Sequence, residues 1–151
     1  MDLIDVEPPY CLYAERAALG AAVLKAEDMT WLRQYTKRAR GRDFYDCLHG
    51  WTWDRLRWYA NKGRPPLVKW WEADGVFRKY EEVFEPRANE RLPLLILQWI
   101  NTDFWWNADY YLDVVLEMSK ARARLTKATE CLKGALEDGT ALRDEYKARY
   151  R

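Results

Sequence analysis

Apolar residues recur at every third or fourth position along most of the chain, and the strict apolar–polar alternation of strands is almost absent. The pattern therefore predicts helices and very little sheet. Asp28 is a suitable N-cap for a second, short helix, and Asp43 is a suitable N-cap for a third. Residues 78–93, which include Pro86 and Pro93, show no clean period. The helices expected before the last third of the chain span residues 14–25, 29–35, 43–61, 68–73 and 94–99.

The last third of the chain has a different pattern. Asn107 is a good N-cap, and the long helix expected from there to about Gly134 carries apolar residues at alternating steps of three and four. This spacing predicts a seam for a second helix, with bulky residues at one position and mostly Ala at the other. Small side chains would let two helix backbones approach closely. The seam comprises Tyr111, Val114, Met118, Ala121, Leu125, Ala128, Leu132 and Ala135.

A helical hairpin is expected at the C-terminal end. Residues 137–140 (Glu-Asp-Gly-Thr) predict a turn, and Leu142, Tyr146 and Tyr150 mark a short return helix. The sequence thus predicts an all-α protein, in which a compact helical head (residues 1–106) is followed by a protruding antiparallel helical hairpin (residues 107–151) as one structural unit. The first hairpin helix would be about 40 Å long. Because the return helix is too short to cover it, we expect the seam to bind a second partner.

Composition and charge narrow the class of protein. The 151 residues include 25 Lys and Arg against 24 Asp and Glu, so that the formal net charge is +1. This balance disfavours a protein that wraps duplex DNA by neutralising its phosphates. Nine Trp and ten Tyr stand against four Phe. Aromatic rings that carry a polar group, such as those of Trp and Tyr, are typical of partly hydrated surfaces that a binding partner covers.

Cysteine spacing and the N-terminus indicate the compartment. Cys11, Cys47 and Cys131 are an odd number of widely separated thiols, which favours reduced cysteines. Residues 1–7 are acidic and do not have the pattern of a signal peptide. The longest apolar stretch, residues 92–100, is too short to span a bilayer. We therefore expect a cytoplasmic protein with no membrane partner.

Residues for catalysis, metal binding or cofactor binding are not evident in the sequence. His49 is the single histidine, and it lies two residues from Cys47, on a different face of the predicted helix, so that a buried core histidine is favoured over a Cys–His pair. One His and three scattered Cys match no metal-ligand spacing. Residues 134–140 begin like a P-loop but lack the Lys that reaches the phosphates. We expect no catalysis, no metal and no cofactor.

The third predicted helix has two distinct faces, one for the core and one rich in tryptophan. The expected structural core comprises Leu19, Phe44, His49, Trp53 and Leu56. The candidate partner patch comprises Trp51, Arg55, Trp58, Trp70 and Trp71. Core packing, a protein contact and stacking on single-stranded nucleic acid are three interpretations of this patch. Residues 38–42 form a basic turn, which is either a solvated loop or a phosphate contact.

Three blocks of the sequence resemble the N-terminal domain of DnaB-type replicative DNA helicases, over residues 8–135. In the first block, prolines lead into a helix with an Ala-Glu pair and a Leu-Gly pair: Pro8-Pro9, Ala14-Glu15, Leu19-Gly20 and Val23. The second block comprises Asp43-Phe44-Tyr45, His49, Leu56 and Gly63. The third block comprises Asn107-Ala108, Tyr110-Tyr111, Val115, Glu117, Arg124-Leu125 and Ala128.

This resemblance implies a helical head and hairpin, dimerisation between hairpins, assembly as a collar on a helicase ring, and contact with a primase or a helicase loader. The sequence departs from the family at Arg16, which takes a glutamine-like position, and in residues 68–93, which are shortened and contain Trp70-Trp71. The motifs of the ATPase motor are absent from the 151 residues. We therefore expect a stand-alone relative of the collar, from a phage or mobile element, without ATPase or unwinding activity.

These observations lead to three hypotheses. The first is an interaction protein of DNA replication that binds itself, a replicative helicase, a primase or a helicase loader, without catalysis of its own. The second is a helical protein that binds single-stranded nucleic acid through its Trp and Arg residues, although the low net charge makes such binding weak or absent. The third is a relative of the helicase-binding tail of primases, which is thought to share the head-and-hairpin shape.

Overall fold

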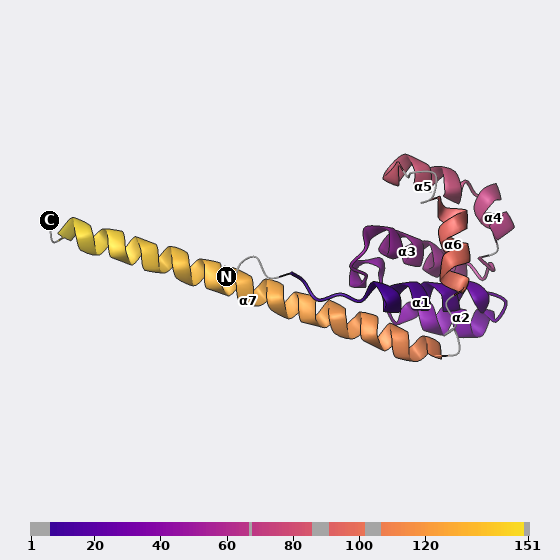
Figure 1. Ribbon diagram of the computed structural model, residues 1–151, viewed down its shortest axis with the longest axis horizontal. Helices are drawn as coiled ribbons and strands as arrows, with labels where there is room; N and C mark the ends of the chain where they lie inside the picture. The colour runs from indigo at the N-terminus through magenta and orange to yellow at the C-terminus, as the bar shows by residue number, and fades with distance from the viewer. Residues whose placement is uncertain (1–6, 67, 86–90, 102–106, 150–151) are drawn as a thin grey trace.

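The computed structural model describes residues 7–66, 68–85, 91–101 and 107–149, with the side chains of residues 68–70 left outside this description. The described residues form helices joined by short turns, without a strand among them, so the expected all-α class is confirmed (Figure 1). The boundary expected at residue 106 falls outside the described residues. The elements in chain order are α1 (Leu12–Leu24), α2 (Met29–Lys37), the 3-10 helix η2 (Gly41–Asp43), α3 (Cys47–Asn61), α4 (Val68–Ala73), α5 (Val76–Phe84), α6 (Leu92–Ile100) and α7 (Ala108–Arg149).

Helix α1 lies at the centre of the head, where it contacts α3, α6 and α7 (Figure 1). Its sequence is rich in small residues, and Ala14, Ala18 and Ala22 are almost completely buried. Gly20 allows the closest approach of all, because a Cβ atom there would lie only 2.2 Å from the carbonyl oxygen of Trp99 on α6. Small side chains on α1 thus determine how tightly the helices of the head pack.

Large aromatic side chains fill the space between these helices. The residues expected in the structural core (Leu19, Phe44, His49, Trp53 and Leu56) are all buried, each with 5% or less of its surface exposed. Two of the buried rings have partners for their polar groups: Trp53 Nε1 donates to the Ala39 carbonyl at 3.0 Å, and the Tyr35 hydroxyl donates to the Ala108 carbonyl at 2.9 Å. Nothing described accepts from the buried Nε1 of Trp71. Burial raises the pKa of the Tyr35 hydroxyl above its ordinary value.

A buried acidic side chain joins α1 to the start of α3. Glu15 is 1% exposed, and its carboxyl oxygens accept from the backbone N–H groups of Tyr45 at 2.9 Å and Asp46 at 3.2 Å. The same carboxyl group lies 3.0 Å from Nδ1 of His49, and the His49 ring packs edge-on against Trp99. The single histidine is therefore a hydrogen-bonded core residue, as the sequence predicts.

The structure shows which residues cap the N-terminal ends of α2 and α3. Asp28 is the N-cap of α2, since its side chain accepts from the backbone N–H of Trp31 at 3.1 Å. The prediction that Asp43 caps the third helix is wrong. Asp46 caps α3 and accepts from Leu48 N–H, whereas Asp43 lies in η2 and accepts from Ser119 Oγ on α7 at 2.8 Å.

Helix α5 was not predicted, although its apolar residues lie on one face. Val76 and Tyr80 are buried one turn apart, and Phe77 and Phe84 on the same face pack against the core. The helix begins after Gly75, whose φ of +71° is a conformation that glycine adopts without strain.

The predicted helical hairpin is also wrong. Helix α7 runs without interruption for 42 residues, through residues 137–140, which the sequence indicated as a turn. A single Gly inside a helix costs only about 1 kcal/mol, and the residues around it are good helix formers. Gly139 does not adopt the positive φ that a reversal would require, since Gly63 and Gly75 are the only described glycines with positive φ. Thr140 stays within the helix by donating its hydroxyl to the Leu136 carbonyl at 2.9 Å.

Only the first part of α7 packs on the head. Ala108, Leu112 and Val115 are buried, and Arg122 then donates to the carbonyl oxygens of Pro9, at 3.0 Å, and Asp43, at 2.5 Å. Beyond Arg122 the helix extends away from every other helix (Figure 1). We call residues 123–149 the distal rod, which at 1.5 Å per residue is about 40 Å long.

Candidate functional site

The distal rod is the most exposed part of the described chain. None of its residues is buried, although several carry large apolar side chains. The exposed fractions are 53% for Leu136, 66% for Leu142 and 64% for Tyr146. Helices in proteins gain most of their stability by packing an apolar face, so a partner for this exposed helix is expected.

The seam predicted from the sequence follows one face of α7 along its whole length. Next to the head, Tyr111, Val114, Met118 and Ala121 are half-buried; in the distal rod, Leu125 and Leu132 are half-buried, and Ala128 and Ala135 are exposed. Because α7 does not turn back, the steps of four and three continue from Ala135 through Gly139, Leu142 and Tyr146. The seam is therefore longer than the sequence pattern predicted.

The head contacts the first part of this seam. Tyr111 and Val114 pack against the core of the head, and the Tyr111 ring makes an edge-on contact with Tyr13 at 5.6 Å between ring centroids. Of the residues of α7 that are fully buried (Ala108, Leu112 and Val115), Leu112 and Val115 each follow a seam residue by one position, which is a rotation of about 100° around the helix axis. A second helix can thus lie along the part of the seam that belongs to the distal rod.

Charged residues of both signs flank the distal part of the seam. In the heptad pattern, Arg124, Asp138 and Glu145 lie on one side of it, and Arg143 lies on the other. A second copy of α7 running parallel would bring Asp138 near Arg143, and one running antiparallel would bring Arg124 near Glu145. Either direction of pairing between two copies therefore offers opposite charges across the seam.

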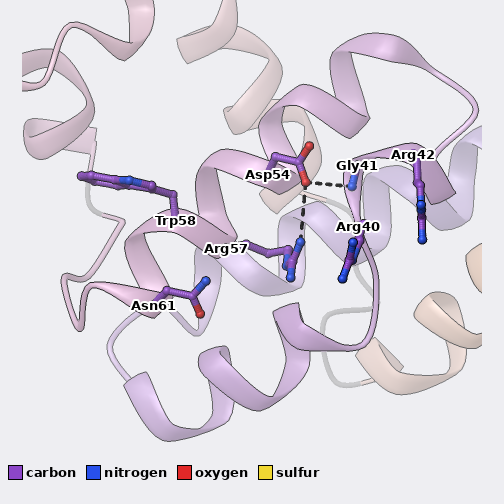
Figure 2. Close-up of a pocket in the computed structure, with 7 residues that line it drawn as sticks. All are labelled: Arg40, Gly41, Arg42, Asp54, Arg57, Trp58 and Asn61. Atoms are coloured by element: carbon purple, nitrogen blue, oxygen red, sulfur yellow. Dashed lines mark hydrogen bonds and ion pairs between the residues drawn. The ribbon is translucent and has the colours of Figure 1, made fainter.

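A second candidate site is a hollow of about 470 Å³ between η2 and α3. The basic turn contributes Arg40 and Arg42, and α3 contributes Arg57, Trp58 and Asn61. Figure 2 shows Trp58 and Asn61 at one end, Arg40 and Arg42 at the other, and Arg57 between them. The structure thus brings the basic turn beside a tryptophan of the candidate partner patch.

Two glycines allow the basic turn to lie this close to α3. A Cβ atom on Gly41 would lie 2.5 Å from the Gly50 carbonyl oxygen, and a Cβ atom on Gly50 would lie 2.3 Å from the Gly41 carbonyl oxygen. The carboxylate of Asp54 fixes the contact by accepting from Gly41 N–H at 2.8 Å (Figure 2). Sequence patterns do not show this approach, since it depends on two backbones that meet in space.

The remaining members of the candidate partner patch lie apart from the hollow. Trp51 is half-buried against Tyr80 and Phe84, with the Arg55 guanidinium 5.0 Å from its ring centroid. Trp71 is 1% exposed and belongs to the core, so the structure removes it from any surface patch. The side chain of Trp70 lies outside the described residues. Trp58, which is 45% exposed, is therefore the patch tryptophan with the most accessible ring among those described.

The residues considered for catalysis and metal binding are separated in the structure. Cys47 is exposed, whereas His49 is buried against Glu15. No group of three or more His, Cys, Asp or Glu side chains within the described residues could hold a metal ion. A search of the same residues also finds no helix that combines the length and the apolarity needed to cross a membrane.

Comparison of the chain with protein-family models, with curated proteins and with solved structures gave no match. The two candidate sites therefore rest on the geometry of this chain alone.

Proposed function

We propose that this protein is a non-catalytic interaction protein of DNA replication that pairs with a second copy of itself along the seam of α7. One observation carries the self-pairing: no residue of the distal rod, which is about 40 Å long, is buried, and the side chains of Leu136, Leu142 and Tyr146 are more than half exposed. Apolar residues at steps of three and four on an uncovered helix are typical of coiled coils. The exposed Ala residues between them would let the two helices lie close together.

A second copy of the chain also supplies a helix that can pack on the seam. The sequence led us to expect a return helix packed on the seam, but residues 141–149 continue straight along α7. In a pair of molecules, α7 of the other copy takes the place of that return helix. The complementary charges at Asp138 and Arg143, or at Arg124 and Glu145, support such a pair.

The replication part of the proposal is supported by the resemblance of three sequence blocks to the collar domain of replicative helicases. Two of the blocks include residues with structural roles in this chain, among them the buried pair Glu15 and His49. The straight α7 departs from the hairpin that the resemblance implies. We propose that the paired molecules bind a replicative helicase, a primase or a helicase loader.

The substitution Ala135→Asp should convert a dimer into a monomer. It places a carboxylate in the seam, where pairing would remove it from water without a partner. Size-exclusion chromatography with light scattering should give twice the monomer mass of 18.1 kDa for the unmodified protein, and 18.1 kDa for the variant at the same concentration.

Ala141→Asp is the matched control for this experiment. Ala141 is also exposed in the distal rod, and the substitution makes the same change of charge and helix propensity, but residue 141 lies off the seam. It should leave the dimer intact. An unmodified protein that is monomeric, or two variants that behave alike, would rule out pairing through the seam.

Binding to the replication machinery is tested separately with purified components. Immobilised protein should retain a helicase, a primase or a loader from one bacterial host, and Ala135→Asp should reduce that retention if the pair is the binding form. If none of the three is retained while the dimer is intact, self-pairing stands and the role in replication is wrong.

A further inference from the structure

The hollow between η2 and α3 has a local excess of positive charge. Arg40, Arg42 and Arg57 line it, with Asp54 as the single acid among its lining residues. Arg40 and Arg42 are exposed, and neither forms an ion pair with any described residue. Arg38 in the same turn is different, because Asp109 and Asp113 on α7 both bind its guanidinium. In the basic turn, Arg38 therefore pairs with α7, whereas Arg40 and Arg42 remain beside the hollow.

Arg57 at the middle of the hollow is incompletely satisfied. Its Nη1 lies 4.0 Å from Asp54 Oδ1, which is too long for a hydrogen bond, and nothing described accepts from its buried Nε. Asp54 is instead engaged by Gly41 N–H. A guanidinium without a close acceptor in a hollow is suited to binding the oxygen atoms of a phosphate group.

Trp58 adds an aromatic surface to the same hollow. Its ring is 45% exposed and packs edge-on against Tyr59, at 5.1 Å between ring centroids. Tyr59 is buried, and its hydroxyl donates to Asp74 at 2.7 Å, so the support beneath Trp58 is rigid. Asn61, one turn further along α3, also lines the hollow and carries an amide donor and acceptor (Figure 2).

We propose that this hollow is a binding site for nucleotide units of single-stranded nucleic acid. A base would stack on Trp58 with its edge near Asn61, while the backbone phosphates would follow the arginines from Arg57 to Arg40 and Arg42. One aromatic ring with three cations next to it provides a stacking surface for a base and positive charge for the backbone phosphates on either side of that base. The proposal goes beyond the proposed function and does not depend on it.

The low net charge of the chain is compatible with a site of this size. A protein that wraps duplex DNA needs a cationic face, but a site for a few nucleotides needs only a local excess of charge. Three arginines against one aspartate provide it here. The site lies on the head, between η2 and α3, whereas the distal rod extends beyond the head (Figure 1).

Fluorescence anisotropy tests the site with a labelled oligothymidylate of about 16 nucleotides. The unmodified protein should bind it at low salt, and Trp58→Ala should weaken binding about 5- to 100-fold, whereas Trp58→Phe should keep most of the affinity. Arg42→Ala should also weaken binding and should lower the slope of log affinity against log salt by about 0.7. Arg78→Ala, which removes an exposed arginine on α5, is the matched control and should change neither value.

Competition with free thymidine monophosphate shows whether the site binds single nucleotides or requires a strand. Displacement of the oligonucleotide by excess thymidine monophosphate supports a site that also takes free nucleotides, and failure to displace it supports a requirement for a strand. Absence of binding at low salt would overturn the proposal. It would also be overturned if Trp58→Ala and Arg42→Ala bind as tightly as Arg78→Ala, because the contact would then lie elsewhere.

Discussion

Replacing Glu15 with Ala should lower the free energy of unfolding by about 3–5 kcal/mol, one of the two largest effects expected for a single substitution in this protein. Glu15 is 1% exposed and is bound by two backbone N–H groups and by His49. Removing the carboxyl group leaves all three partners without an acceptor in a place that water does not reach. Each unsatisfied buried group costs about 1–3 kcal/mol, and a small cavity adds to the loss.

Two further variants isolate the cause of that loss. Glu15→Gln retains one carbonyl oxygen and nearly the same volume, so its stability should fall between those of the unmodified protein and Glu15→Ala. Glu27→Ala removes an exposed acid after α1 and should change stability by no more than about 0.5 kcal/mol. The measurement is urea denaturation at a fixed protein concentration, since pairing of molecules would itself contribute to stability. Equal losses in Glu15→Gln and Glu15→Ala would show that charge, and not hydrogen bonding, dominates this site.

Features that depend on neighbouring residues in the sequence could be predicted. The N-cap at Asp28 is one, because capping is local chemistry between residues three positions apart. The buried face of α3 is another, since His49, Trp53 and Leu56 repeat at helical spacing and are all buried. The seam of α7 could also be placed on one helix face from its period alone.

Features decided by competition between weak signals could not be predicted. Gly139 and its polar neighbours favour a turn, but the cost of one glycine is small beside the helix propensity of the residues that surround it. The N-cap of α3 was misplaced because Asp43 and Asp46 are both suitable cap residues. In the structure Asp43 accepts a hydrogen bond from Ser119 on α7, and Asp46 caps the helix. Propensity cannot rank two such candidates without the tertiary contact.

The hollow beside α3 was beyond sequence reasoning for a different reason. The basic turn and Trp58 were both recognised, but as separate features 16 or more residues apart. What joins them is the contact between Gly41 and Gly50, because a Cβ atom on either residue would clash with the backbone carbonyl oxygen of the other. The signal that could have found it is the pair of glycines nine residues apart around a predicted helix start, which has many other interpretations.

Gly20→Ala should destabilise the protein by about 3 kcal/mol, at the upper end of the effects of overpacking. The added Cβ would lie 2.2 Å from the carbonyl oxygen of Trp99 and 2.7 Å from its carbonyl carbon. Both atoms belong to the backbone near the end of α6, so no side chain can rotate to make room. The strain must move α1 and α6 apart, and that movement disturbs Trp99 and its contact with His49. Thermal or urea denaturation followed by circular dichroism would measure the loss.

Gly134→Ala is the matched control, because it makes the same substitution inside a helix where a Cβ would meet nothing within 4 Å. Ala has the higher helix propensity and restricts the unfolded chain, so this variant should gain about 0.5–1 kcal/mol. Residue 134 lies off the seam, and the gain is therefore independent of pairing, which would not hold for Gly139. The intrinsic benefit of Ala applies equally at residue 20, so the difference between the two variants measures the clash with α6 by itself. If both variants were stabilised, α1 and α6 could not be packed as closely as Gly20 requires.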